Sequence, residues 1–173
     1  MPHFVVSGLP RVIPQDERTA GWFAATRMLV AWRRARGQRV VEPDTISGEA
    51  QDHRGENALP WDRVSKFATS LGLSTVPAVG DRPTPALVEQ WLRRYGPLLT
   101  DGVAVAANGM PACPGHVVVL GGVDPRPITS QIYVLDPWPE EVGAYGWRPF
   151  SQLTSIFGLR NDRRRQVSFL HYP

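Results

Sequence analysis

The fold is decided by VIPQDERTAGWFAATRMLVAWRRAR, residues Val12–Arg36. From Gly21 onward the apolar side chains recur every three or four residues, which is the spacing of one buried helix face. Asp16 or Thr19 is suited to cap the first turn, and Gly37 follows the basic last turn as a stop. We therefore predict one long helix that begins close to Gly21. The buried stripe comprises Trp22, Ala25, Met28, Leu29 and Trp32.

A glutamine, Gln15, lies six residues before Gly21, and Trp22 follows Gly21 directly. This pattern resembles papain-like cysteine peptidases, particularly the short bacterial and bacteriocin-processing types. The resemblance implies that Gln15 occupies the oxyanion-hole position and that Gly21 occupies the position of the nucleophilic cysteine. A thiol at a helix N-terminus is favoured as the thiolate, and a glutamine side chain with a backbone N–H can stabilise an oxyanion. Glycine would keep the helix start and remove the nucleophile.

Two later segments match the same template in the same chain order. Gly115-His116 opens an apolar run, where the family carries its general base, and Asp136 ends another, where the family carries the residue that orients the histidine. The resemblance covers about residues 10–170 and implies these roles for His116 and Asp136. Each residue alone is a weak signal, since a histidine at a strand start is commonly structural and Asp before Pro often forms a turn. The hypothesis depends on the four positions together.

The 173 residues suit a single domain, residues 1–173, and a content of 42% hydrophobic and 20% charged residues is ordinary for a soluble globular protein. Helical periodicity dominates the first half and short strands dominate the second, which predicts an α+β fold. The papain-like layout agrees, because its nucleophile helix packs on a largely antiparallel sheet. We predict an edge strand at Phe4–Val6, a surface loop at Gln38–Pro60, helices at Trp61–Leu71 and Thr84–Tyr95, strands at Leu98–Leu99, Val103–Ala107, Val117–Leu120, Ile132–Leu135 and Val167–Leu170, and a short helix at Phe150–Phe157.

The single cysteine, Cys113, excludes an intrachain disulfide. It lies three residues before His116, which suggests a substitute nucleophile, but this spacing would place both groups on one loop, away from the helix dipole and Gln15. A metal site is disfavoured as well, because no second pair of ligands follows at a zinc-like spacing. We therefore predict neither a metal nor a cofactor. The other histidines, His3, His53 and His171, are scattered along the chain.

The net charge of +3 includes the basic run Arg163–Arg165, which no stacking aromatic residues accompany. A solvated hairpin turn explains this run better than nucleic-acid binding does, so we predict no nucleic-acid partner. We expect no secretory signal, because no basic start is followed by a long apolar core, and no membrane-spanning run. Lys66 is the only lysine beside 18 arginines, a bias typical of GC-rich bacterial genomes. We expect a protein of the bacterial cytoplasm, or one exported without a signal peptide, and leave its oligomeric state open.

The sequence leads to a papain-like domain that cannot carry out nucleophilic hydrolysis. The first hypothesis is a pseudoenzyme that binds a peptide or protein partner in the inherited cleft, with Trp22 and Trp138 as predicted binding residues, although each also fits a core position. The alternative is an active bacterial effector peptidase or deamidase whose cysteine was replaced by glycine. Alanine or serine would be the usual replacement, because glycine at a helix start is more costly. A scaffold or nucleic-acid-binding protein without peptidase ancestry is a third possibility.

Overall fold

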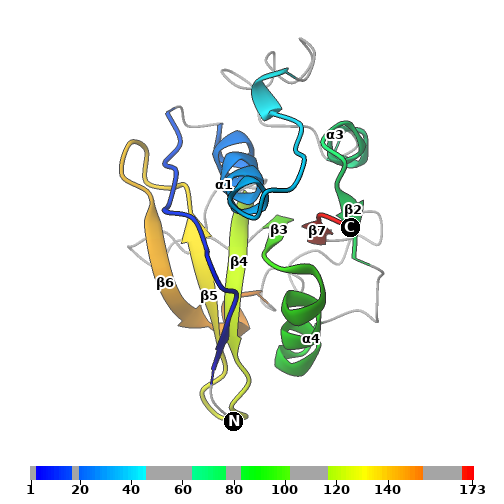
Figure 1. Cartoon of the computed structure of the whole chain (residues 1–173). Helices are drawn as coiled ribbons and strands as arrows, with labels where there is room; N and C mark the ends of the chain where they lie inside the picture. Colours follow the sequence, from blue (N-terminus) through cyan, green and yellow to red (C-terminus); the bar gives the residue numbers. More distant parts are fainter. Residues whose placement is uncertain (1–2, 17–19, 46–63, 77–82, 102–116, 154–168) are drawn as a thin grey trace.

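The described part of the chain forms one seven-stranded sheet with helices on both of its faces (Figure 1). The computed structural model describes residues 3–16, 20–45, 64–76, 83–101, 117–153 and 169–173. The main path of the sheet runs β2-β7-β3-β4-β5-β6, with β1 beside β4, and every pairing is antiparallel. This architecture confirms the predicted α+β fold. The elements are β1 (Phe4–Val5), α1 (Gly21–Ala35), η1 (Pro43–Thr45), α3 (Val64–Ser70), β2 (Ser74–Thr75), α4 (Pro85–Tyr95), β3 (Leu98–Asp101), β4 (Val117–Asp124), β5 (Gln131–Asp136), β6 (Ala144–Pro149) and β7 (Phe169–His171).

Helix α1 begins at Gly21, as the sequence predicted, but its cap differs from the prediction. The N-cap residue is Ala20, whose carbonyl accepts hydrogen bonds from the N–H groups of Phe23 and Ala24, both at 3.0 Å. Asp16 and Thr19 are therefore wrong as cap residues, because the helix begins directly after a residue whose side chain has no oxygen. At the other end, Gly37 adopts φ +69°, and its N–H donates to the carbonyl of Arg34 at 2.8 Å, which confirms the predicted stop.

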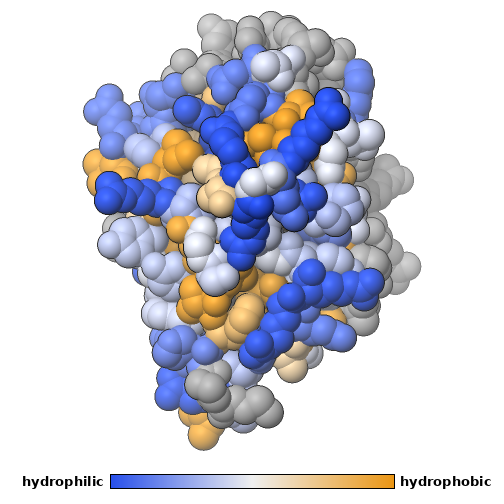
Figure 2. All heavy atoms as spheres, in the orientation of Figure 1, coloured by the Kyte–Doolittle hydropathy of each residue, from blue (hydrophilic) through white to orange (hydrophobic). Residues whose placement is uncertain are grey.

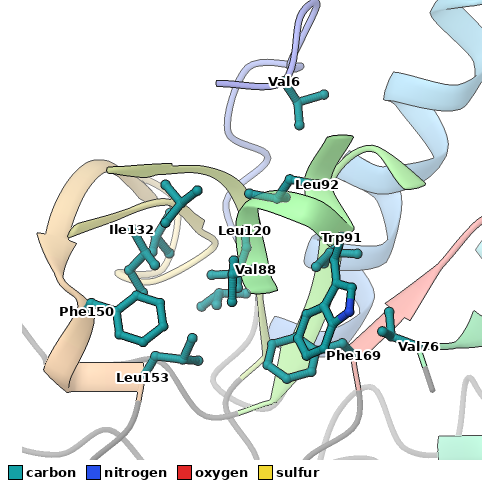
Figure 3. Close-up of a cluster of buried hydrophobic side chains, with 14 of the residues drawn as sticks. Val6, Val76, Val88, Trp91, Leu92, Leu120, Ile132, Phe150, Leu153 and Phe169 are labelled. Atoms are coloured by element: carbon teal, nitrogen blue, oxygen red, sulfur yellow. The ribbon is translucent and has the colours of Figure 1, made fainter. Parts of the chain in front are cut away.

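The two faces of the sheet bury two separate sets of side chains, because successive residues of a strand point to opposite faces. On β4, Val119 packs in the cluster that contains the α1 stripe, whereas Val118 and Leu120 pack in the cluster that contains α4. Figure 3 shows the α4 side, where Trp91 meets Phe169 with ring centroids 5.1 Å apart. Helix α1 thus packs on β3, β4 and β5, on the face of the sheet opposite to the face that α4 covers.

The two shorter helices agree with their sequence signals. The Oγ1 of Thr84 caps α4 by accepting a hydrogen bond from the N–H of Leu87 at 3.2 Å, and Gly96 ends that helix with φ +82°. Helix α3 starts at Val64, and Gly72 follows it with φ +70°. The start of the predicted helix at Trp61 lies outside the described residues.

Most predicted strands are present, and two strands were missed. β1, β3, β4, β5 and β7 correspond to predicted runs, whereas β2 has only two residues and β6 has the sequence AYGWRP. Glycine and proline, which occur within β6, are typical of turns. Only its pairing with β5 makes this segment a strand. Residues 150–153 are helical, as predicted. The predicted strand at 103–107, the basic run at 163–165 and Cys113 lie outside the described residues.

Arginine side chains cover aromatic rings near the ends of α1 and α4. The guanidinium of Arg36 lies 4.3 Å from the ring centre of Trp32, and that of Arg93 lies 4.1 Å from the ring centre of Phe4. Figure 2 shows the resulting surface, with long hydrophilic side chains between small apolar patches. These side chains shield apolar rings from water while their charged groups remain solvated.

Gly96 allows α4 to end against the side chain of Trp32. A Cβ at this position would lie 2.3 Å from Cη2 of Trp32, and the positive φ already disfavours any other residue. Gly37 provides a matched control, because its φ is also positive but a Cβ there would meet no atom within 4 Å.

We predict that Gly96→Ala lowers the free energy of unfolding by at least about 3 kcal/mol, because backbone strain and overpacking add. Gly37→Ala should cost about 1 to 2 kcal/mol, from strain alone. Urea denaturation of both variants measures the difference. Equal losses would show that the close contact with Trp32 relaxes without cost.

Tyr172 is buried against α1, and desolvation raises the pKa of its hydroxyl to about 12. Its hydroxyl oxygen has no hydrogen-bond partner in the part of the chain that the structure describes. A tyrosine with a raised pKa holds its proton more tightly in the folded state than in the unfolded state. The contribution of the protonated Tyr172 to the free energy of unfolding is therefore complete below pH 10 and is lost as pH rises toward about 12.

We expect Tyr172→Phe to remove part of the alkaline instability of the protein. Between pH 10 and about 12, the wild type should lose on the order of 2 kcal/mol more stability than the variant. Denaturant unfolding over this pH range measures it. Parallel pH profiles would mean that the Tyr172 hydroxyl titrates normally in the folded protein.

Candidate active site

Gln15 is held by its backbone between two residues of the β5–β6 loop. Its N–H donates to the carbonyl of Pro137 at 3.0 Å, and its own carbonyl accepts from the N–H of Glu141 at 2.9 Å. Only 1% of the residue is exposed. The segment before α1 therefore enters the fold at a defined place beside the end of β5.

Asp136 is the last residue of β5 and is half-buried. Its Oδ1 accepts a hydrogen bond from the N–H of Trp138 at 2.9 Å, which is an Asx-turn that starts the β5–β6 loop. Pro139 continues this loop by accepting hydrogen bonds from Val142 and Gly143 at 3.2 and 2.7 Å. Because Pro137 both follows Asp136 and binds Gln15, the structure brings these two predicted residues to the same end of the sheet.

The start of β4 lies at this same end. Val119 pairs with Leu135 in the antiparallel register, so the residues before Val119 lie alongside those after Leu135. Val117, the first residue of β4, packs against the cluster that contains α1. His116, the predicted general base, lies outside the described residues, and its position stays a prediction.

Gly21 is buried at the start of α1, and the helix packs on the side chains of Val119 and Leu135. Figure 1 shows residues 6–16 crossing in front of the sheet and reaching its upper end before α1 begins. Of the described predicted positions, Gln15 and Asp136 thus lie at the same end of the sheet, and Gly21 begins the helix that packs on β4 and β5.

The two predicted binding tryptophans differ in burial. Trp22 is 3% exposed, and its ring meets Phe67 at 4.7 Å and Phe23 at 5.5 Å between centroids. Its ring lies in the core between α1 and α3, so its burial gives no support to the predicted role in binding, which stays a prediction. Trp138 is half-buried beside Asp136, which leaves it as a candidate.

The β5–β6 loop is the part of the site that sequence reasoning missed. A Cβ on Gly143 would lie 2.3 Å from Cγ1 of Val12, and the residue has φ +64°, so only glycine lets the loop close on the segment before α1. The available signal was a glycine shortly after Pro139. Its partner Val12 is remote in sequence, and no local pattern identifies it.

The described residues contain no group of three or more His, Cys, Asp or Glu side chains that could hold a metal ion. Among the same residues, no helix combines the length and the apolar character needed to cross a bilayer.

The α+β fold, with the Gly21 helix packed on an antiparallel sheet, is consistent with the papain-like cysteine peptidase superfamily. A family model described as papain-like cysteine protease AvrRpt2 matches residues 8–154, a range that includes all four template positions. The chain therefore belongs to this family of papain-like cysteine proteases. No curated protein gives a significant match.

We predict that Gly143→Ala loosens the segment that carries Gln15. The clash with Val12 and the positive φ should together cost roughly 2 to 4 kcal/mol of stability. The amides of Gln15 and Glu141 should also exchange hydrogen faster relative to amides in the centre of β4. Hydrogen exchange with residue resolution measures both effects.

The double variant Val12→Ala with Gly143→Ala is the matched control, because it removes the clash and keeps the backbone strain. It should be less destabilised than the sum of the two single variants. Strict additivity would contradict a direct contact between this loop and Val12.

Proposed function

We propose that this chain is a catalytically inactive papain-like peptidase homologue that binds a peptide or protein partner through the inherited cleft. The observation that carries the proposal is the position of Gly21. It is the first residue of α1, six residues after Gln15, where the family resemblance requires a thiol. Glycine offers no atom that could attack a carbonyl carbon.

The proposed roles of the other residues follow the template. Gln15 stands at the oxyanion-hole position, His116 at the general-base position and Asp136 at the position that orients the histidine. Without a nucleophile no covalent acyl intermediate forms, and in a serine peptidase the loss of the nucleophile alone costs about a millionfold in turnover. What such a site retains is the ability to hold a polypeptide next to an oxyanion-hole residue.

The proposed binding cleft is bordered by the β5–β6 loop. The fixed backbone of Gln15 supports this part of the proposal, because a segment held on both sides by hydrogen bonds presents its neighbours to a partner with little loss of entropy. Trp138, half-buried next to Asp136, is the aromatic residue that we propose for partner contact.

The test restores the missing thiol with Gly21→Cys. At a helix N-terminus near His116, the new thiol should have a pKa below the value of about 8.5 for a free cysteine. With iodoacetamide at mildly acidic pH, it should react roughly tenfold or more faster than Cys113 in the same molecule. Mass spectrometry of the two cysteine-containing peptides measures both rates.

His116→Ala in the Gly21→Cys background is the control, because it removes the proposed imidazolium partner and should slow alkylation of the new thiol only. A Gly21→Cys thiol that reacts no faster than Cys113 and is indifferent to His116 would overturn the proposed site. Return of peptidase activity is not required, since groove details can be lost after the nucleophile is lost.

A further inference from the structure

Strand β6 ends the main path of the sheet, and its pairing with β5 determines which of its backbone groups face outward. The N–H of Phe150 donates to the carbonyl of Ser130 at 2.9 Å, so this pair is of the hydrogen-bonded type. In an antiparallel ladder the types alternate along each strand. Residues 144, 146 and 148 therefore bond to β5, whereas Tyr145, Trp147 and Pro149 turn their backbone groups to the outer edge.

The half of this edge farther from the candidate site is closed. Pro149 has no N–H to offer, and the carbonyl oxygen of Trp147 accepts a hydrogen bond from Nη1 of Arg148 at 3.2 Å. Proline and a charged side chain are devices by which proteins prevent an edge strand from pairing with another chain. This half of β6 is protected against strand addition.

The half nearer the candidate site has no such protection among the described residues. Tyr145 directs both its N–H and its carbonyl outward, and 69% of the residue is exposed. It pairs with Leu135, the residue before Asp136, so it lies one residue from the predicted site. Val142, in the adjoining loop, is 72% exposed. An open backbone position with apolar side chains beside it fits an added strand.

The charge next to this position indicates the kind of strand. Glu140 and Glu141 are both exposed and lie in the same loop as Val142. The N–H of Glu141 holds the carbonyl of Gln15, which fixes the backbone of this acidic pair relative to the site. A basic side chain next to an apolar one is complementary to this surface.

We infer that the Tyr145 end of β6 docks an extended peptide of alternating apolar and basic residues, which adds to the sheet as an antiparallel strand. One peptide residue exchanges two backbone hydrogen bonds with Tyr145, its apolar side chains contact Tyr145 and Val142, and a basic side chain faces Glu140 and Glu141. The inference rests on the proposed function, and it names the docking edge and the chemistry of the partner. The closed half of β6 limits the added strand to the end beside the candidate site.

A second copy of the chain is a less suitable occupant than a peptide. Pairing of β6 with itself would need a longer open edge, but Pro149 and Arg148 close half of it. Sedimentation of the protein alone should therefore show no β6-dependent dimer.

The experiment uses a fluorescein-labelled peptide of alternating valine and lysine and measures binding by fluorescence anisotropy. Tyr145→Pro removes the outward N–H and breaks no bond to β5, so it should weaken binding roughly tenfold. Tyr145→Phe keeps the backbone and should bind like the wild type. Arg148→Ala frees the carbonyl of Trp147 and should strengthen binding.

A second probe keeps the test independent of how well Tyr145→Pro folds. The same peptide, N-methylated at alternate residues so that it cannot donate toward β6, should bind wild-type protein roughly tenfold more weakly. Glu140→Gln with Glu141→Gln should reduce binding and its dependence on salt. Equal affinities for the two peptides, or no binding of either, would overturn the inference.

Trp138→Ala separates this inference from the proposed function. If Tyr145→Pro binds the peptide like the wild type and Trp138→Ala does not, the cleft binds the peptide but the β6 edge does not, and the inference fails alone. If Tyr145→Pro loses binding and the Gly21→Cys thiol is unreactive, the docking edge stands and the proposed site fails. A dimer that Tyr145→Pro abolishes would replace the peptide with a second copy.

Discussion

The pair of backbone hydrogen bonds that holds Gln15 between Pro137 and Glu141 is the constraint on which the candidate site depends. It joins the segment before α1 to a loop more than a hundred residues later in the chain, and it does so without any charged group. Backbone bonds of this kind have fixed geometry and, once buried, are costly to break, because the freed N–H and C=O groups would lack partners. The end of β5 and the approach to α1 are thereby fixed relative to each other.

The second requirement is that α1 be fixed over the sheet, and packing provides this. Its apolar stripe lies on side chains of β4 and β5, and the opposite face of the same strands is covered by α4. A strand buried on both faces cannot shift its register by one residue without turning every side chain to the wrong face. The helix that begins at Gly21 is consequently held in one place on the sheet.

The chain belongs to a cysteine protease family, yet it has no thiol at position 21. Our proposal explains both facts, because the scaffold of the fold is kept while its use is changed. Binding needs positioned backbone and accessible side chains, and both exist at the β5–β6 loop without a nucleophile. The unequal protection of β6 fits this view. Proline and arginine close the half of the edge farther from the candidate site, and the open position lies beside Asp136.

The sequence by itself determined the helix from Gly21, the start of α4 after Thr84, most strands of the sheet and the family to which the chain belongs. These features depend on local periodicity, on capping groups and on short motifs that act within a few residues. The tertiary structure alone decided that Ala20 caps α1, that Trp22 belongs to the core and that AYGWRP is a strand. It also decided that Gly143 must be glycine, because its neighbour Val12 is distant in sequence. Such features arise from contacts between remote segments, and no local pattern of residues encodes them.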